Sequence, residues 1–215
     1  PERFLKAGRE SILEKKHGTL VVWSKLDKIT LKTGNGILRN CETEIGRIHR
    51  HWLDLRLNDI RGYICNVERP EQPTATPIYF RPNDPMYLMA NSSVPTPWDT
   101  EPMFQEWGPP GGSEWKFKDS EGKEHRVVVR FSIVKPEVLN SSEKPNPGSE
   151  DWGLHARHNI GVSVVREDRE IVLDDNFMRE GGAGENPMNR WWGCEVSFLR
   201  GVDEIFGVDQ NKQMA

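Results

Sequence analysis

Between positions 37 and 55, apolar side chains recur at spacings of three, four and seven residues. This spacing places them along one side of an α-helix, so the segment predicts an amphipathic helix that begins after the turn residues Asn35–Gly36. The apolar positions are Ile37, Leu38, Cys41, Ile45, Ile48, Trp52 and Leu55. Residues 60–67 follow with an alternation typical of a strand.

The second part of the chain carries mainly strand patterns. Val127 to Val134 is an apolar run rich in β-branched residues, which strongly predicts a strand. Glu167–Asp168 lies between two shorter apolar runs and predicts a turn that joins them. The predicted strands are residues 114–117 with 125–133, closed around the turn 119–122, then 159–165 with 170–173, and last 190–198.

These elements predict an α+β fold with a mixed or antiparallel sheet and helices on one face. A short helix is expected at Trp152–His158. Residues 68–77 are rich in proline and threonine, which is typical of a boundary between domains. We therefore expect one domain at residues 1–70 and a second at 75–215.

The charge of the chain argues against nucleic-acid binding. The net charge is -4, so the chain as a whole lacks the basic surface that dominates such binding. Arg47, Arg50 and Arg56 form a local basic group on the predicted helix. We interpret them as a solvated helix face.

Three widely spaced cysteines, Cys41, Cys65 and Cys194, are an odd number without a CxxC pair. This count favours reduced thiols and a cytoplasmic location. No apolar run approaches the length of a membrane span, and no signal peptide is visible. Because the sequence starts at Pro1 in charged, helix-like residues, we expect it to be a fragment or a processed product.

A candidate phosphate site lies near the C-terminus. Asn211, Lys212 and Gln213 follow the predicted strand 190–198 on a loop. A lysine ammonium is a mobile point charge, and two flanking amides add hydrogen-bond donors, so the triplet suits a phosphate. Taken alone, such a triplet is more typical of a solvated loop.

Two separated motifs give this loop a context. Gly18 and Thr19 open the predicted strand 19–23, ahead of the long helix, and Gly193–Phe198 precedes the Lys212 loop. This order resembles the end of the GHKL ATP-binding fold followed by its transducer domain, which is similar to ribosomal protein S5. The superfamily includes the ATP-binding part of DNA gyrase, MutL, the ninety-kilodalton heat-shock chaperones, MORC proteins and histidine kinases. The Lys212 loop looks closest to that of MORC-like members.

The resemblance implies a nucleotide-sensing role. It implies that Lys212 contacts the γ-phosphate of ATP and acts as the catalytic lysine, with Asn211 and Gln213 as supporting amides. It further implies that Gly18 and Thr19 help to line the adenine pocket. Movement of the loop between nucleotide states would couple ATP binding to domain movement or dimerisation, and an ATP-dependent homodimer is the implied partner.

The resemblance also implies what this chain lacks. In the superfamily the magnesium ligands, the general base and most of the adenine pocket precede the Gly-Thr strand, whereas only 17 residues precede Gly18 here. ATP and Mg²⁺ would thus be cofactors of the complete protein, held largely by a missing N-terminal ATP-binding part. Because phosphoryl transfer needs a positioned metal and an activated water, we expect no ATP hydrolysis by this chain alone.

A second hypothesis comes from a different class of protein. The proline-rich segment 77–112 contains Trp98, Phe104 and Trp107, which predict a module that docks a peptide or a partner protein. His155 and His158 are three positions apart, but no cysteine or carboxylate stands at ligand spacing, so we interpret them as packed or surface residues rather than zinc ligands.

Overall fold

The computed structural model describes residue 19 and residues 33–54, 59–64, 77–119, 121–176 and 186–202. The helix-like N-terminal residues, most of the predicted strand 19–23 and the C-terminal loop lie outside these ranges. The chain forms two compact units. Unit 1 contains Pro1–Glu42 and Asp59–Phe80, and unit 2 contains Thr43–Asn58 and Arg81–Ala215. The domain boundary expected at 70–75 stays a prediction.

The described part of unit 1 contains the start of a helix and a small sheet. Helix α2 (Gly34–Ile48) starts after Thr33, whose side-chain oxygen accepts a hydrogen bond from the Gly36 N–H at 3.1 Å. Strands β1 (Arg61–Gly62) and β2 (Ile78–Tyr79) pair antiparallel. A Cβ at Gly62 would lie 2.4 Å from the end of the Leu38 side chain, so β1 approaches this helix closely and a larger residue would require that side chain to move.

The helices of unit 2 agree with the predicted helical segments. The last part of α2 is followed by α3 (Arg50–Asp54), and the two together match the helix predicted at 37–55. The predicted helix at 152–158 is also confirmed. The other helices are α4 (Pro136–Asn140), η1 (Pro147–Ser149), α5 (Asp151–His158) and η4 (Pro187–Trp191).

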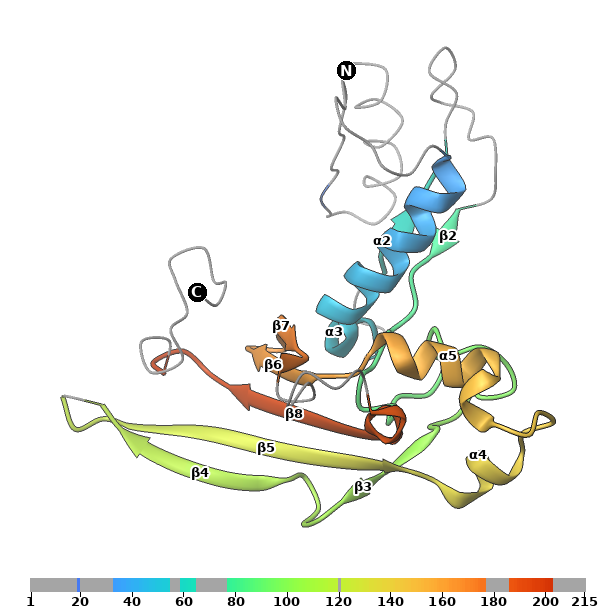
Figure 1. Ribbon diagram of the computed structural model, residues 1–215. Coiled ribbons are helices and arrows are strands. Elements are labelled where there is room, and N and C mark those ends of the chain that lie inside the picture. Colours follow the sequence, from blue (N-terminus) through green and yellow to red (C-terminus); the bar gives the residue numbers. More distant parts are fainter. Residues whose placement is uncertain are drawn as a thin grey trace, which may run out of the picture. The chain divides into compact units, whose positions relative to one another are not determined.

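Six strands of unit 2 form one mixed sheet (Figure 1). Their order is β3-β5-β8-β6-β7, and β4 pairs with the remaining length of β5. All neighbours are antiparallel except β6 and β8. The strands are β3 (Phe104–Trp107), β4 (Ser113–Lys118), β5 (Glu124–Val134), β6 (Val162–Arg166), β7 (Arg169–Asp174) and β8 (Trp192–Phe198). The α+β class with a mixed sheet is therefore confirmed.

Both predicted hairpins are present, and local chemistry closes them. The Asp119 carboxylate accepts hydrogen bonds from the N–H groups of Glu121 and Lys123, which fixes the turn between β4 and β5. Glu167 and Asp168 close the β6–β7 turn with positive φ angles of 49° and 63°. Both turns therefore form where the sequence predicts them.

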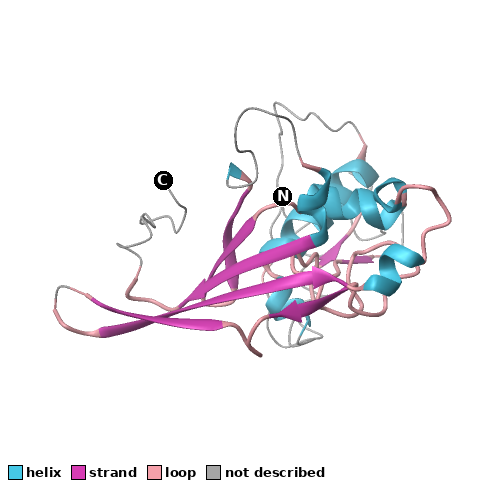
Figure 2. Ribbon diagram, turned by 60° about the horizontal axis from the view of Figure 1, so that its bottom comes forward, coloured by secondary structure: helices cyan, strands magenta, loops and turns pink. Residues whose placement is uncertain are grey.

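The long strand β5 contributes to both faces of the sheet. Its even-numbered residues, such as Ser132 and Val134, belong to the helix face, which we define as the face covered by α3 and α5 (Figure 1). Figure 2 shows the same strands and helices from a second direction. Its odd-numbered residues, such as Val127 and Phe131, belong to the opposite face, which we call the aromatic face. Near its start, β5 buries Val127 on the aromatic face, and at its end it buries Val134 on the helix face. The strand therefore contributes to two separate hydrophobic cores.

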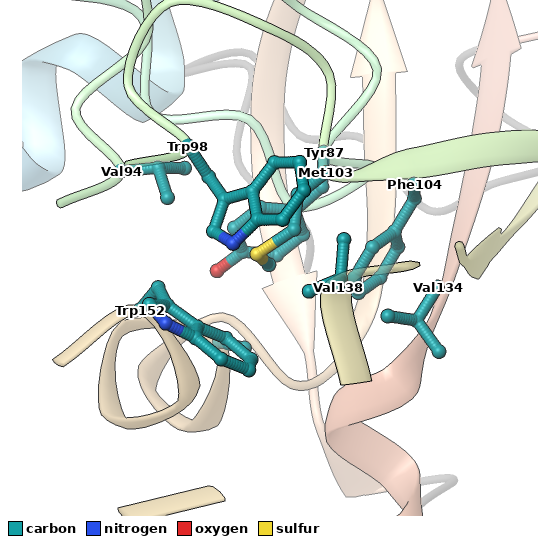
Figure 3. Packing of buried hydrophobic residues seen from close by; sticks show 9 residues of the cluster. Tyr87, Val94, Trp98, Met103, Phe104, Val134, Val138 and Trp152 are labelled. Carbon is teal, nitrogen blue, oxygen red and sulfur yellow. The ribbon is translucent and has the colours of Figure 1, made fainter. Parts of the chain in front are cut away.

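The larger core lies on the helix face. Figure 3 shows its side chains converging from the 81–103 segment, β3, the end of β5, α4 and α5. Trp98 is 8 % exposed and Phe104 only 1 %. Two of the three aromatic residues behind the docking hypothesis for segment 77–112 are therefore core residues and cannot contact a partner, whereas Trp107 is 62 % exposed.

The smaller core lies on the aromatic face. It unites Val127 of β5, Val164 of β6 and Phe198 of β8 with Val202, which follows the last strand. The adjacent tryptophans 191 and 192 separate as expected for neighbouring positions at the start of a strand. Trp191 packs against Trp152 in the larger core, and Trp192 stands opposite Ile133 in the sheet.

Candidate functional site

The structure places only one of the residues predicted to bind nucleotide. Thr19 is exposed and lies outside any helix or strand. Gly18, Asn211, Lys212 and Gln213 lie outside the described residues, so the structure does not bring the predicted phosphate loop and the Gly-Thr pair together or separate them.

A buried ionic cluster lies between α3 and the helix face of the sheet. Its centre is Arg50, which is 0 % exposed. We call it the Arg50 cluster, and its members are Arg50, Asp84, Ser163, Glu170 and Glu195. The interpretation of Arg50 as part of a solvated helix face was therefore wrong, because the sheet supplies carboxylates that pair with it inside unit 2.

The Arg50 guanidinium donates along two of its edges. Nη1 donates to Glu170 Oε2 at 2.7 Å and to the Arg47 carbonyl at 3.1 Å. Nη2 donates to Glu195 Oε2 at 2.7 Å and to Ser163 Oγ at 2.6 Å. Nε lies 3.6 Å from Asp84 Oδ1, which is an ion-pair distance rather than a hydrogen bond. One arginine thus connects α3 to strands β6, β7 and β8.

The carboxylates of the cluster have further partners. Glu170 Oε1 accepts from Arg47 Nε at 2.6 Å, and its Oε2 also accepts from the Ser163 hydroxyl. Glu195 Oε2 lies 3.0 Å from His51 Nε2. Asp84 instead accepts from three backbone N–H groups, those of residues 86, 88 and 89. Its carboxylate therefore holds the irregular segment after β2 in place.

The electrostatics of the cluster keep Arg50 and Glu195 ionised. Burial alone would raise the pKa of Glu195, but the hydrogen bond from His51 and the charge of Arg50 outweigh it and lower the pKa to about 2. Burial alone would likewise lower the pKa of Arg50, but the three carboxylates raise it. Burial raises the pKa of Asp84 despite the nearby Arg50 charge.

This arrangement suits a structural role rather than catalysis. Arg50 and Ser163 are each 0 % exposed, so no substrate can reach the serine hydroxyl or the guanidinium without unfolding the layer above. Removing one partner of a buried ion pair typically costs several kcal/mol, because the other charge remains buried. The cluster therefore fastens α3, and with it the end of α2, to the sheet of unit 2.

A second polar network, the His155 network, joins α5 to the irregular segment 81–103. His155 Nδ1 lies 3.0 Å from the Tyr87 hydroxyl, and His155 Nε2 lies 3.2 Å from Ser93 Oγ. The Asn159 amide donates to the Tyr87 hydroxyl at 2.9 Å and to Asn83 Oδ1 at 2.6 Å. A serine beside a histidine raises the question of nucleophilic catalysis.

The hydrogen-bond network answers this question through the tautomer of His155. Because the Tyr87 hydroxyl accepts from Asn159, its own proton is free to be donated to His155 Nδ1. His155 then carries its proton on Nε2 and donates it to Ser93, so it cannot act as the base for that hydroxyl. Burial, with smaller effects of His158 and Arg81, lowers the pKa of His155 to about 4, which keeps the ring neutral.

The described part of the chain contains no candidate metal site. No group of three or more histidine, cysteine or acidic side chains there is arranged to hold a metal ion. Among the described residues, no helix has the length and apolar character needed to cross a membrane.

Comparison of the chain with protein-family models, curated proteins and solved structures found no match.

Sequence reasoning missed the Arg50 cluster because its members are far apart in the chain. Arg50 is separated from Glu170 by 120 positions and from Glu195 by 145. The local pattern gives no signal of burial, since Glu195 and Ser197 alternate with the apolar Cys194, Val196 and Phe198, as in a strand with one polar face. That Glu195 is buried is seen only in the structure, where a buried carboxylate needs a cation such as Arg50.

Proposed function

We propose that this chain is the transducer portion of a GHKL-type ATPase, which senses the γ-phosphate of ATP and passes the nucleotide state on as movement. The observation that carries the proposal is the Arg50 cluster. It joins α3, which continues the helix that follows the Gly-Thr motif, to β8, the strand that precedes the Lys212 loop. Two elements that lie between these motifs in the chain, α3 and β8, are thus joined by a buried ion pair in unit 2.

Lys212 is the residue that would respond to nucleotide. Its ammonium would pair with the γ-phosphate, with Asn211 and Gln213 donating from either side, and Gly18 and Thr19 would contribute to the adenine pocket. ATP would supply the phosphate charge. After its loss the loop would be released, and β8 would transmit this change to α3 through Glu195 and Arg50. The resemblance assigns the Mg²⁺ ligands to other residues of the ATP-binding part, so the proposed role of Lys212 does not include holding the metal.

Hydrogen–deuterium exchange on the full-length protein tests the proposal. We expect a non-hydrolysable ATP analogue to slow exchange at residues 203–215, and ADP not to do so, because only the analogue carries a γ-phosphate. Lys212→Ala should abolish this difference, whereas Lys212→Arg should retain part of it. Lys144→Ala is the matched control, since Lys144 pairs with Glu150 in an exposed loop of unit 2.

Two results would overturn the proposal. One is equal protection by ADP and by the ATP analogue at saturating concentrations. The other is protection that persists in Lys212→Ala.

The rival peptide-docking module at 77–112 has lost its main support, since Trp98 and Phe104 belong to the core.

A further inference from the structure

The aromatic face of unit 2 exposes large apolar side chains along one edge of the sheet. The register places them on the same face, because Trp115 stands opposite Val127 and Trp107 opposite Phe131, and residues two apart in β5 share a face. Their exposed fractions are Trp107 62 %, Trp115 59 %, Ile133 40 %, Phe117 39 % and Phe131 36 %. Trp107 and Phe131 are in ring contact, with centroids 6.1 Å apart. Large apolar side chains exposed together on one face are typical of an interaction surface.

Strand β4 forms the edge beside this patch. Among the described strands it pairs only with β5, and all six of its residues are exposed. The backbone N–H and C=O groups on the outer side of an edge strand are a template for another strand. The edge is therefore able to extend the sheet by pairing with a further chain.

The other side of β4 carries three charged residues, Glu114, Lys116 and Lys118. Glu114 and Lys116 point to the face opposite Trp115, since neighbouring residues of a strand alternate. Arg126 Nε lies 2.9 Å from Glu114, and Lys116 Nζ lies 3.2 Å from Glu124. An acid and a base thus flank Trp115 on an exposed edge.

We propose that a second copy of this chain pairs antiparallel with β4, with Trp115 opposite Trp115 of the second copy. In this register Glu114 stands opposite Lys116 of the second copy, and Lys116 opposite Glu114 of the second copy, so both charge pairs are favourable. Such an interface is self-complementary, as a two-fold dimer requires. It also continues the aromatic face across both copies.

Of the three nearest registers, the one centred on Trp115 alone opposes no like charges. Centring the pair on Lys116 would oppose two lysines while setting Glu114 opposite Lys118 of the second copy, and centring it on Glu114 would oppose two glutamates. A shift by one residue would place the aromatic side of one strand beside the charged side of the other. Lysine on an edge strand normally discourages pairing. In this edge strand the charges instead favour the register without like-charge pairs, and a second copy of the same chain supplies the complementary residues.

Sedimentation velocity on the full chain without nucleotide tests the dimer. We expect a monomer–dimer equilibrium that shifts with concentration. Glu114→Lys and Lys116→Glu should each weaken the dimer by roughly ten- to a hundredfold in Kd, because both pairs become repulsive. An equimolar mixture of the two variants should dimerise again, because the lysines of one then face the glutamates of the other. The double variant should also recover the homodimer.

The mixture distinguishes the interface from simple loss of folding, since a damaged strand in either variant would not be repaired by the other. Lys123→Glu is the matched control, because it makes the same charge change in the exposed turn and should leave Kd unchanged. A wild-type chain that stays monomeric at all concentrations would overturn the proposal, and so would a mixture no better than either variant alone. The test needs no nucleotide, so its outcome is independent of the proposed ATP-sensing role.

Discussion

At the scale of single residues, Arg50 has the largest consequence for this fold. Its guanidinium donates hydrogen bonds of 2.6–2.7 Å to carboxylates on two strands and to the Ser163 hydroxyl. A lysine has no planar fork and cannot reach the same partners together. In principle, well-packed apolar residues at this position would give a fold at least as stable. The cluster is therefore better explained by specificity, because it fixes a single arrangement of α3 on the sheet.

Replacing Arg50 by alanine should destabilise unit 2 strongly. The change leaves the carboxylates of Asp84, Glu170 and Glu195 buried close to one another, so we expect a loss of about 3–5 kcal/mol in the free energy of unfolding. Urea denaturation followed by tryptophan fluorescence measures it. Arg126→Ala is the control, because the exposed Arg126 pairs with Glu114 at the surface and should cost about 1 kcal/mol or less. A similar small loss for Arg50→Ala would contradict the structural role of the cluster.

At the scale of elements, the sequence predicted what depends on local pattern. The helices at 37–55 and 152–158, the β4–β5 hairpin and the β6–β7 turn each follow from periodicity or turn residues within a few positions. It failed where the environment comes from distant residues. Nothing near Arg50 in the chain shows that β7 and β8 supply carboxylates, and nothing near Trp98 shows that α5 and β3 cover it.

The end of helix α2 illustrates a further constraint of this kind. A Cβ at Gly46 would lie 2.5 Å from the Arg81 carbonyl oxygen, which belongs to the backbone and cannot easily move. Alanine usually stabilises a helix interior relative to glycine by about 1 kcal/mol. At this position the clash should outweigh that gain, because overpacking costs typically 1–3 kcal/mol.

We therefore expect Gly46→Ala to lower the free energy of unfolding by about 1–2 kcal/mol. Gly34→Ala is the matched control in the same helix, since its Cβ would meet only the flexible Ile64 side chain at 3.3 Å. This control should be neutral or slightly stabilising. Thermal unfolding monitored by circular dichroism compares the two variants, and a stabilised Gly46→Ala protein would show that the Arg81 backbone yields.

At the scale of the whole molecule, two buried titratable groups make the fold sensitive to acid. His155 in its neutral form belongs to the network with Tyr87 and Ser93, and ionised Glu195 belongs to the Arg50 cluster. Both groups have a lower pKa in the folded protein than in the unfolded chain, about 4 against 6.5 for His155 and about 2 against 4.5 for Glu195. Protons therefore bind the unfolded chain more readily, and acidification favours unfolding.

The two groups should act in successive pH ranges. The contribution of His155 is complete above pH 6.5 and is lost as the pH falls towards 4, and that of Glu195 is complete above pH 4.5 and is lost towards pH 2. Each shift corresponds to at most roughly 3.5 kcal/mol, since one pKa unit equals about 1.4 kcal/mol. Urea unfolding at intervals from pH 7.5 to pH 3 should show stability falling throughout.

His155→Gln should be less stable at pH 7. Its free energy of unfolding should no longer change with pH between 6.5 and 4, because glutamine does not titrate. An unchanged slope in this variant would place the acid sensitivity in other groups.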